Sequence, residues 1–155
     1  DRKHLEELGG VAFVVVTNAD HVRNAEWLAR TCDARLAGPR AERDEFPFAC
    51  DLWLGDGDEP VPGLRVLALE GSKTPGEVAL VLEGTTLITG DLVRAHEGGR
   101  LTTLPAPKLR DAAAAARSVR RLAALPGIEA VLVGDGWPIF RDGGAALREL
   151  AESPG

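Results

Sequence analysis

Hydrophobic residues along this chain follow two alternating patterns. Apolar positions spaced three or four residues apart, with polar residues between them, predict amphipathic helices. Short continuous apolar runs bounded by Gly, Pro or Asp predict strands. The helices are predicted over residues 3–8, 21–31, 112–125 and after 142, and the strands around 11–16, 35–37, 52–54, 64–69, 78–82, 85–89 and 130–133. Because helices and strands interleave, we predict a layered α/β sandwich forming a single domain over residues 1–155.

Local signals add detail to this prediction. Residues 51–90 hold short apolar runs separated by turn residues, which predicts an antiparallel sheet, and Glu83-Gly84 predicts a tight hairpin within it. Asp111 and Asp142 each precede a helical pattern, so we predict that both are N-caps. Residues 94–110 show no recognisable binding pattern, and we interpret them as a loop.

Composition narrows the class of protein. A chain of 155 residues that is 45% hydrophobic can bury one core but is too short for two ordinary domains. Its net charge is −6, from 18 basic and 24 acidic residues, which argues against a nucleic-acid-binding surface. No apolar run approaches the roughly 18 residues of a membrane span. Two cysteines are too few for a disulfide framework. We therefore predict a cytoplasmic protein that binds neither nucleic acid nor membrane.

Four segments with chemically useful side chains each follow a predicted strand. They are Asp20-His21, Ser72-Lys73-Thr74-Pro75-Gly76, Gly90-Asp91 and Gly134-Asp135-Gly136. In α/β proteins, functional groups gather on the loops at the carboxyl ends of strands. We therefore expect Asp20, Asp91 and Asp135 to converge at one edge of the fold.

The order of these segments resembles the metallo-β-lactamase superfamily, including its glyoxalase II-like hydrolases. That family's pattern is His-x-His-x-Asp-His, then Gly-His-Thr-Pro-Gly, Gly-Asp and Gly-His-Gly. The stretch that matches the first motif is Val16-Thr17-Asn18-Ala19-Asp20-His21, and the other three segments match in the family's order. The resemblance implies a metallo-β-lactamase-like αββα sandwich with mixed sheets. The family fold normally begins with further strands, and we find none before residue 11, so the chain is expected to lack its N-terminal strands.

The family's metal ligands carry over only in part. The first metal would require histidine at Val16, Asn18 and Lys73, and all three are lost. The second metal would use Asp20, His21, the bridging Asp91 and a histidine that is replaced here by Asp135. The resemblance therefore implies that a dinuclear zinc site is absent.

Three converging carboxylates repel one another unless something neutralises them. A proton could be shared within the cluster. One divalent metal (Mn, Fe, Mg or Zn) could bind to Asp20, His21, Asp91 and Asp135. Lys73 could instead place its ammonium among the carboxylates as a built-in counterion, which requires no ligand. We favour the lysine, with no cofactor, and keep the single metal as the alternative.

Each of these residues also has a purely structural interpretation. Asp20 would suit the N-cap of the following helix, and His21 could bond to a loop carbonyl. Asp91 and Asp135 lie next to glycines, where Asp commonly makes local turn bonds. Lys73 would be unremarkable as an exposed loop residue. It is the order of the segments that favours a shared site.

Two functional classes follow. The first is a metallo-β-lactamase-fold protein that is non-catalytic or of altered activity, with Lys73 replacing metal charge in an acidic cleft that accepts a small molecule. The second is a mono-metal hydrolase of an ester, thioester or phosphoester, in which Asp20 or Asp91 acts as the catalytic base beside the metal ligands His21 and Asp135. A homo-oligomer formed through an exposed sheet face is a further expectation.

Overall fold

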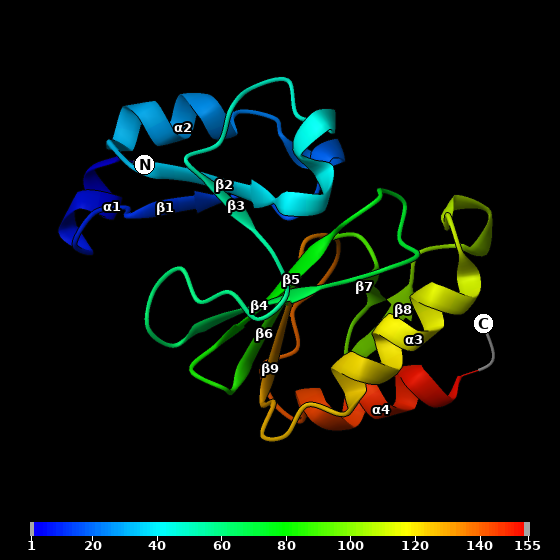
Figure 1. Cartoon of the computed structure of the whole chain (residues 1–155). Helices are drawn as coiled ribbons and strands as arrows, with labels where there is room; N and C mark the ends of the chain where they lie inside the picture. Colours follow the sequence, from blue (N-terminus) through cyan, green and yellow to red (C-terminus); the bar gives the residue numbers. More distant parts are fainter. Residues whose placement is uncertain (1, 154–155) are drawn as a thin grey trace.

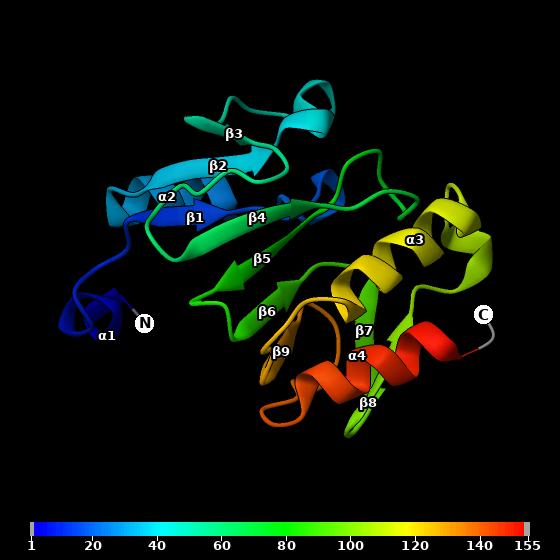
Figure 2. The ribbon, with the colours of Figure 1, turned by 60° about the horizontal axis from the view of Figure 1, so that its bottom comes forward.

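The structure, a computed structural model, describes residues 2–153 and consists of four stacked layers (Figure 1). Helix α2 covers the outer face of a first sheet, and this sheet packs against a second one. Helices α3 and α4 cover the far face of the second sheet, as the turned view also shows (Figure 2). This arrangement confirms the predicted α/β sandwich, although only the second of these two sheets mixes parallel and antiparallel strands.

The elements follow the predicted order closely. The helices are α1 (Arg2–Glu7), α2 (Ala25–Cys32), α3 (Ala112–Ala123) and α4 (Gly143–Glu152), and the 3-10 segments are η1 (Ala19–His21), η2 (Arg40–Glu45) and η3 (Ala106–Lys108). The strands are β1 (Phe13–Val15), β2 (Arg35–Pro39), β3 (Leu52–Leu54), β4 (Leu64–Ala68), β5 (Val78–Leu82), β6 (Thr86–Thr89), β7 (Val93–Glu97), β8 (Arg100–Thr103) and β9 (Ala130–Val133). No helix within residues 2–153 is long and apolar enough to cross a membrane.

The first sheet has the strand order β1-β2-β3 and is parallel throughout. Strand β3 was predicted to belong to the antiparallel region, and this is wrong. Its residues Leu52 and Leu54 pair with Ala37 and Pro39 of β2 in parallel register. The sequence pattern cannot distinguish a parallel from an antiparallel strand here, because a run of three apolar residues looks the same in either orientation.

The second sheet has the strand order β4-β5-β6-β9. Strands β4, β5 and β6 are antiparallel, and the predicted hairpin turn is confirmed, with Glu83 and Gly84 at φ 50° and 69°. Both central residues of a type I′ turn need such positive φ values. Strand β9 then lies parallel to β6, with Thr89 opposite Val133. This register places the loops after β6 and β9 side by side.

A hairpin of β7 and β8 occupies much of the segment 94–110 that we interpreted as a loop, so that interpretation is wrong for residues 94–103. Its strands alternate between the core and solvent: Val93, Ala95 and Leu101 are buried, while His96 and Arg100 are exposed. Charged residues interrupt the apolar pattern, which is why the alternation is weak in the sequence. The hairpin matters for the site because it carries Arg94.

Three apolar clusters hold the layers together. Between the two sheets lie Ala37, Leu54, Val66, Val78 and Leu80. A larger cluster joins the second sheet to α3, α4 and the β7–β8 hairpin, with Leu87, Leu122 and Leu147 fully buried in it. A smaller one joins α2 to the first sheet. Burial of these side chains is the main favourable contribution to folding.

Both predicted residues occupy the N-cap position of their helix, but only Asp111 makes the capping hydrogen bond. The Asp111 carboxylate accepts a hydrogen bond from the Ala114 amide at 2.9 Å, as a cap of α3 should. Asp142 precedes α4, but it is left-handed with φ 59° and its side chain makes no capping bond. Its left-handed backbone differs from the extended conformation that an N-cap side chain requires.

Replacing Asp111 with alanine is expected to lower the free energy of unfolding by about 1 kcal/mol, because the Ala114 amide loses its acceptor. Urea unfolding at pH 7 measures the change. The control is Asp142→Gly, which removes a side chain without a capping bond and suits the left-handed backbone. An Asp111→Ala protein as stable as the wild type would contradict the capping role.

Candidate functional site

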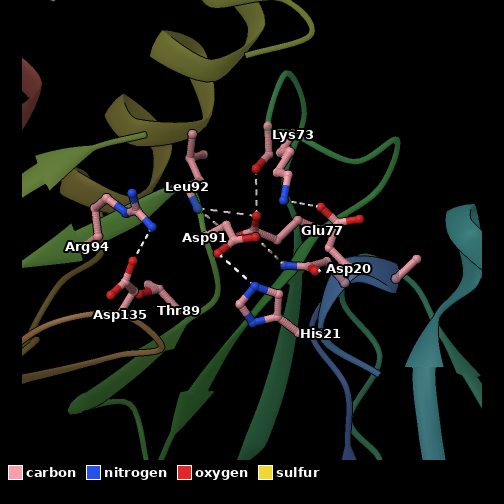
Figure 3. Close-up of polar contacts among 12 residues, drawn as sticks. Asp20, His21, Lys73, Glu77, Thr89, Asp91, Leu92, Arg94 and Asp135 are labelled. Atoms are coloured by element: carbon pink, nitrogen blue, oxygen red, sulfur yellow. Dashed lines mark hydrogen bonds and ion pairs between the residues drawn. The ribbon is translucent and has the colours of Figure 1, made fainter. Parts of the chain in front are cut away.

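The four predicted segments meet at one end of the sheets (Figure 3). Asp20 and His21 lie in η1, just beyond β1, and Lys73 lies in the connection between β4 and β5. Asp91 follows β6, and Asp135 follows β9. The parallel register of β6 and β9 and the Gly134 amide, which donates to the Thr89 carbonyl at 3.1 Å, hold the last two loops together.

Lys73 forms an ion pair with Asp20. The hydrogen bond to Asp20 raises the pKa of the Lys73 ammonium above its usual value, and the charges of Asp20 and Asp91 act in the same direction. The side chains are 44% and 39% exposed, so the pair lies at the rim of the site. The structure therefore places the lysine next to the carboxylate that we expected it to neutralise.

His21 and Asn18 hold Asp91 in the interior. The Asp91 carboxylate is buried, its Oδ1 lies 3.2 Å from His21 Nε2, and its Oδ2 accepts from Asn18 Nδ2 at 3.4 Å. Asn18 is fully buried, and its Oδ1 also accepts from the Asp20 amide at 3.1 Å. Asn18, and not Asp20, is thus the N-cap of η1. Asn18, at a position where the resemblance implies a metal ligand, is therefore a structural hydrogen-bonding group.

Asp135 turns toward the β7–β8 hairpin. It forms an ion pair with Arg94, and His96 Nε2 lies 3.3 Å from its Oδ2. Sequence reasoning missed Arg94, although it stands only three residues after Asp91 on an alternating strand. As a result, Asp20 and Asp135 each have a separate cation, and the expected single cluster of three carboxylates is divided into pairs.

Two fully buried glutamates, Glu42 and Glu77, support the site loops, and our sequence analysis identified neither of them. Glu42 of η2 accepts hydrogen bonds from the amide of Ala19 and, at 2.8 Å, from that of Gly76. It therefore joins the loop that carries Asp20 to the loop that carries Lys73. The nearest sequence signal is the acidic composition of residues 40–45, which does not reveal which carboxylate points inward.

Glu77 lies beneath Asp91. Its carboxylate accepts from Ser72 Oγ at 2.6 Å and from the Leu92 amide at 3.0 and 3.2 Å. Burial raises the pKa of Glu77 from 4.5 to about 7; the two hydrogen bonds oppose this rise, while the charges of Asp91 and Glu42 add to it. Glu77 is therefore an acid that titrates near neutral pH inside the protein.

These residues surround a hollow of about 250 Å³, which we call the basic hollow. Its lining consists of His21, Arg23, Lys73, Asp91, Arg94, Leu104, Lys108, Gly134 and Asp135. The lining has four Arg or Lys side chains and two carboxylates, so the prediction of an acidic cleft is wrong. The cause is that three of the basic residues, Arg23, Arg94 and Lys108, lie in segments for which the sequence predicts no functional side chain.

The side chains present do not fit the family's metal site. At the first-metal positions, Val16 packs into an apolar cluster with Ala29 and Leu36, Asn18 is engaged in hydrogen bonds, and Lys73 presents a cation. Within residues 2–153, no three His, Cys, Asp or Glu side chains are grouped so that they could hold a metal ion. Asp20 and Asp135 are each paired with a separate cation. For this reason Asp20, His21, Asp91 and Asp135, the residues expected to hold the second metal, form no such group.

Comparison with known families matches residues 1–154 to a family described as the metallo-beta-lactamase superfamily. Among curated proteins, the hydroxyacylglutathione hydrolase of Ectopseudomonas mendocina (strain ymp) is 39% identical over 112 residues, or 70% of this chain. The match spans 40% of the length of that hydrolase.

Solved structures with the same fold come from several sources. A metallo-beta-lactamase superfamily protein from the archaeon Sulfolobus tokodaii superposes with a TM-score of 0.69 at 15% identity, covering 93% of this chain and 68% of that one. TTHA1623, whose structure was solved in a di-iron-bound form, gives 0.69 at 22% identity, covering 96% and 80%. A metallo beta lactamase from Erythrobacter litoralis gives 0.69 at 19%, covering 91% and 68%. At these identities the similarity concerns the fold.

Proposed function

Because the chain belongs to the metallo-β-lactamase superfamily, we propose that it is a member in which basic side chains neutralise the site carboxylates in place of metal ions. The predicted resemblance to that superfamily, with a glyoxalase II-like relative, is confirmed. Such a protein would not catalyse metal-dependent hydrolysis and would bind a small molecule in the basic hollow. The observation that supports it is the ion pair between Lys73, at a metal-ligand position, and Asp20.

Electrostatics explain why this pair opposes metal binding. A divalent cation between Asp20 and Asp91 would stand beside the Lys73 ammonium, and like charges a few ångströms apart repel strongly where water is partly excluded. Arg94 has the same effect at Asp135, and its side chain is only 15% exposed, so water screens that charge weakly. Metal binding would require both ion pairs to break.

The competing hypothesis is a mono-metal hydrolase that uses Asp20, His21, Asp91 and Asp135. The His21–Asp91 contact at 3.2 Å is compatible with it, because both side chains would need to stay close to one ion. It also requires Asp20 to leave Lys73, and Asp135 to leave Arg94 and His96. We give these three contacts, which oppose metal binding, more weight than the single His21–Asp91 contact, which is compatible with it.

Metal content tests the proposal. Protein purified without chelator is expected to contain no stoichiometric metal by elemental analysis. Replacing Lys73 with methionine is expected to strengthen Mn²⁺ binding about tenfold or more, because the carboxylates lose their counterion while the aliphatic stem remains. Isothermal titration calorimetry with Mn²⁺ measures this.

The matched control is Arg110→Met, which removes one positive charge outside the basic hollow and should leave Mn²⁺ affinity unchanged. The proposal fails if the wild type contains one metal ion per chain that is lost in Asp91→Ala. It also fails if the wild type hydrolyses ester, thioester or phosphoester substrates and a chelator abolishes that activity.

A further inference from the structure

Two cations in the basic hollow have no acidic partner in the part of the chain that the structure describes. Arg23 and Lys108 both line the hollow and are exposed at its rim. Within residues 2–153, neither side chain takes part in an ion pair or a side-chain hydrogen bond, whereas Lys73 and Arg94 each have a carboxylate. The hollow therefore has positive charge beyond what its own carboxylates neutralise.

Arg94 retains unused hydrogen-bonding capacity as well. Its guanidinium has five N–H donors, and the carboxylate of Asp135 accepts from one terminal nitrogen. Its Nε is buried and has no partner within residues 2–153. Because Nε is shielded from solvent, an oxyanion in the basic hollow would be bound by the remaining terminal N–H donors of Arg94.

Backbone strain is located at the same place. Arg23 has φ 31°, an unfavourable value for a residue with a side chain, and it interrupts the helical pattern between η1 and α2. It is also the reason why the predicted helix over residues 21–31 begins only at Ala25. Strained residues that persist in a fold are concentrated at functional sites. In this case the strained residue is one of the two unpaired cations.

We propose that the basic hollow binds a small phosphoryl dianion, either inorganic phosphate or a compact phosphate monoester, through Arg23, Lys108 and Arg94. Arginine suits this class of ligand because its planar group of donors matches the oxygens of phosphate. This inference rests on the proposed function, since it requires that basic side chains, and not a metal, bind the ligand.

Size and charge limit the ligand to this class. A hollow of about 250 Å³ lies below the range of roughly 300–1,000 Å³ typical of drug-sized ligands. The net charge of −6 on the whole chain disfavours long polyanions. Of the two lining carboxylates, Asp135 is paired with Arg94, and Asp91 is 4% exposed and already contacts His21 and Asn18. Four lining cations against these two carboxylates leave the basic hollow with a net positive charge that favours a dianion.

Isothermal titration calorimetry with inorganic phosphate at pH 7 tests the site. The wild type is expected to bind one phosphate per chain, and Arg23→Gly and Lys108→Ala are each expected to weaken binding about tenfold or more, because each removes a charge-assisted hydrogen bond. Arg23→Gly also suits the positive φ, so it should fold at least as well as the wild type. The control is Arg110→Ala, which removes an exposed cation two residues from Lys108 that does not line the hollow.

A second set of titrations identifies what is recognised. Methyl phosphate binding as tightly as inorganic phosphate supports a site for the phosphoryl group itself, and acetate binding as tightly as phosphate overturns the assignment. The proposal is also overturned if phosphate does not saturate the wild type, or if Arg23→Gly, Lys108→Ala and Arg110→Ala bind alike.

The failure of this inference is distinguishable from that of the proposed function. Metal-free protein that neither hydrolyses substrate nor binds phosphate overturns the phosphoryl site alone. Phosphate binding that disappears when a chelator is added shows that the anion binds to a metal, which contradicts the proposed function as well.

Discussion

Replacing Glu42 with alanine is expected to lower the free energy of unfolding by about 3 kcal/mol. The change leaves the amides of Ala19 and Gly76 without their acceptor and opens a cavity at a fully buried position. Relief of the cost of burying a carboxylate offsets part of this loss. Urea unfolding at pH 7 gives the value.

The two loops that carry the Ala19 and Gly76 amides cannot readily move closer to η2 to fill the cavity that Glu42 would leave. Gly76 already lies so close to η2 that a Cβ at this position would be 2.3 Å from the Cβ of Ala41. Loss of Glu42 should therefore loosen the loop that carries Lys73 and weaken its contact with Asp20. Hydrogen exchange at the Ala19 and Gly76 amides should become faster in Glu42→Ala.

The matched control is Glu45→Ala, which removes an exposed carboxylate from the same 3-10 segment and should cost less than about 0.5 kcal/mol. Glu42→Gln keeps the volume and one acceptor oxygen, so its loss should be intermediate. If Glu42→Ala and Glu45→Ala unfolded at the same urea concentration, the bridging role of Glu42 would be refuted.

Replacing Glu77 with glutamine is expected to stabilise the protein at pH 8 by an amount on the order of 3 kcal/mol relative to the wild type. The pKa of this buried acid is about 7 in the folded protein, against an ordinary value of 4.5 that applies in the unfolded chain. Each pKa unit corresponds to about 1.36 kcal/mol, so ionising Glu77 in the folded state carries a cost of that order. Glutamine can accept from the Leu92 amide and pair with Ser72 without ionising.

The sign of the pH dependence follows from proton binding. Between pH 4.5 and about 7 the folded state holds the Glu77 proton while the unfolded state has released it. The free energy of unfolding therefore falls as pH rises through this window and is constant, as far as Glu77 is concerned, below and above it. Unfolding curves recorded from pH 4 to pH 8 should show this decline in the wild type and lose it in Glu77→Gln.

Glu70→Gln is the control for this series because Glu70 is exposed in the same connection between β4 and β5. Its pH profile should follow that of the wild type. A Glu77→Gln protein with the same decline between pH 4.5 and 7 would show that another group is responsible.

The sequence was most informative where a local signal decides the structure. The Glu83-Gly84 hairpin, the Asp111 cap and the order of the four site segments each depend on a few neighbouring residues, and the structure has them as expected. The order of these segments together with the family resemblance predicted Lys73 among three carboxylates, and the structure pairs it with one of them, Asp20. No long-range information was needed beyond the order of the strands.

The rest depends on contacts between distant segments. Which acid of residues 40–45 turns inward is decided by the approach of the Ala19 and Gly76 amides to Glu42. The charge of the hollow was predicted with the wrong sign because Arg23, Arg94 and Lys108 are brought there by a strained turn, a hairpin and a 3-10 segment. None of these three placements has a periodic signature.

The backbone links between β7 and the segment after β9 have an evolutionary consequence. The Ala95 amide donates to the Asp135 carbonyl at 3.0 Å, the Trp137 amide donates to the Ala95 carbonyl at 2.6 Å, and a Cβ on Gly136 would meet the Ala95 oxygen at 2.0 Å. Main-chain atoms thus hold this loop, whichever side chain occupies position 135. An exchange between histidine and aspartate at this position would leave these main-chain bonds in place, so the side-chain chemistry of the basic hollow can change without a change in the path of the loop.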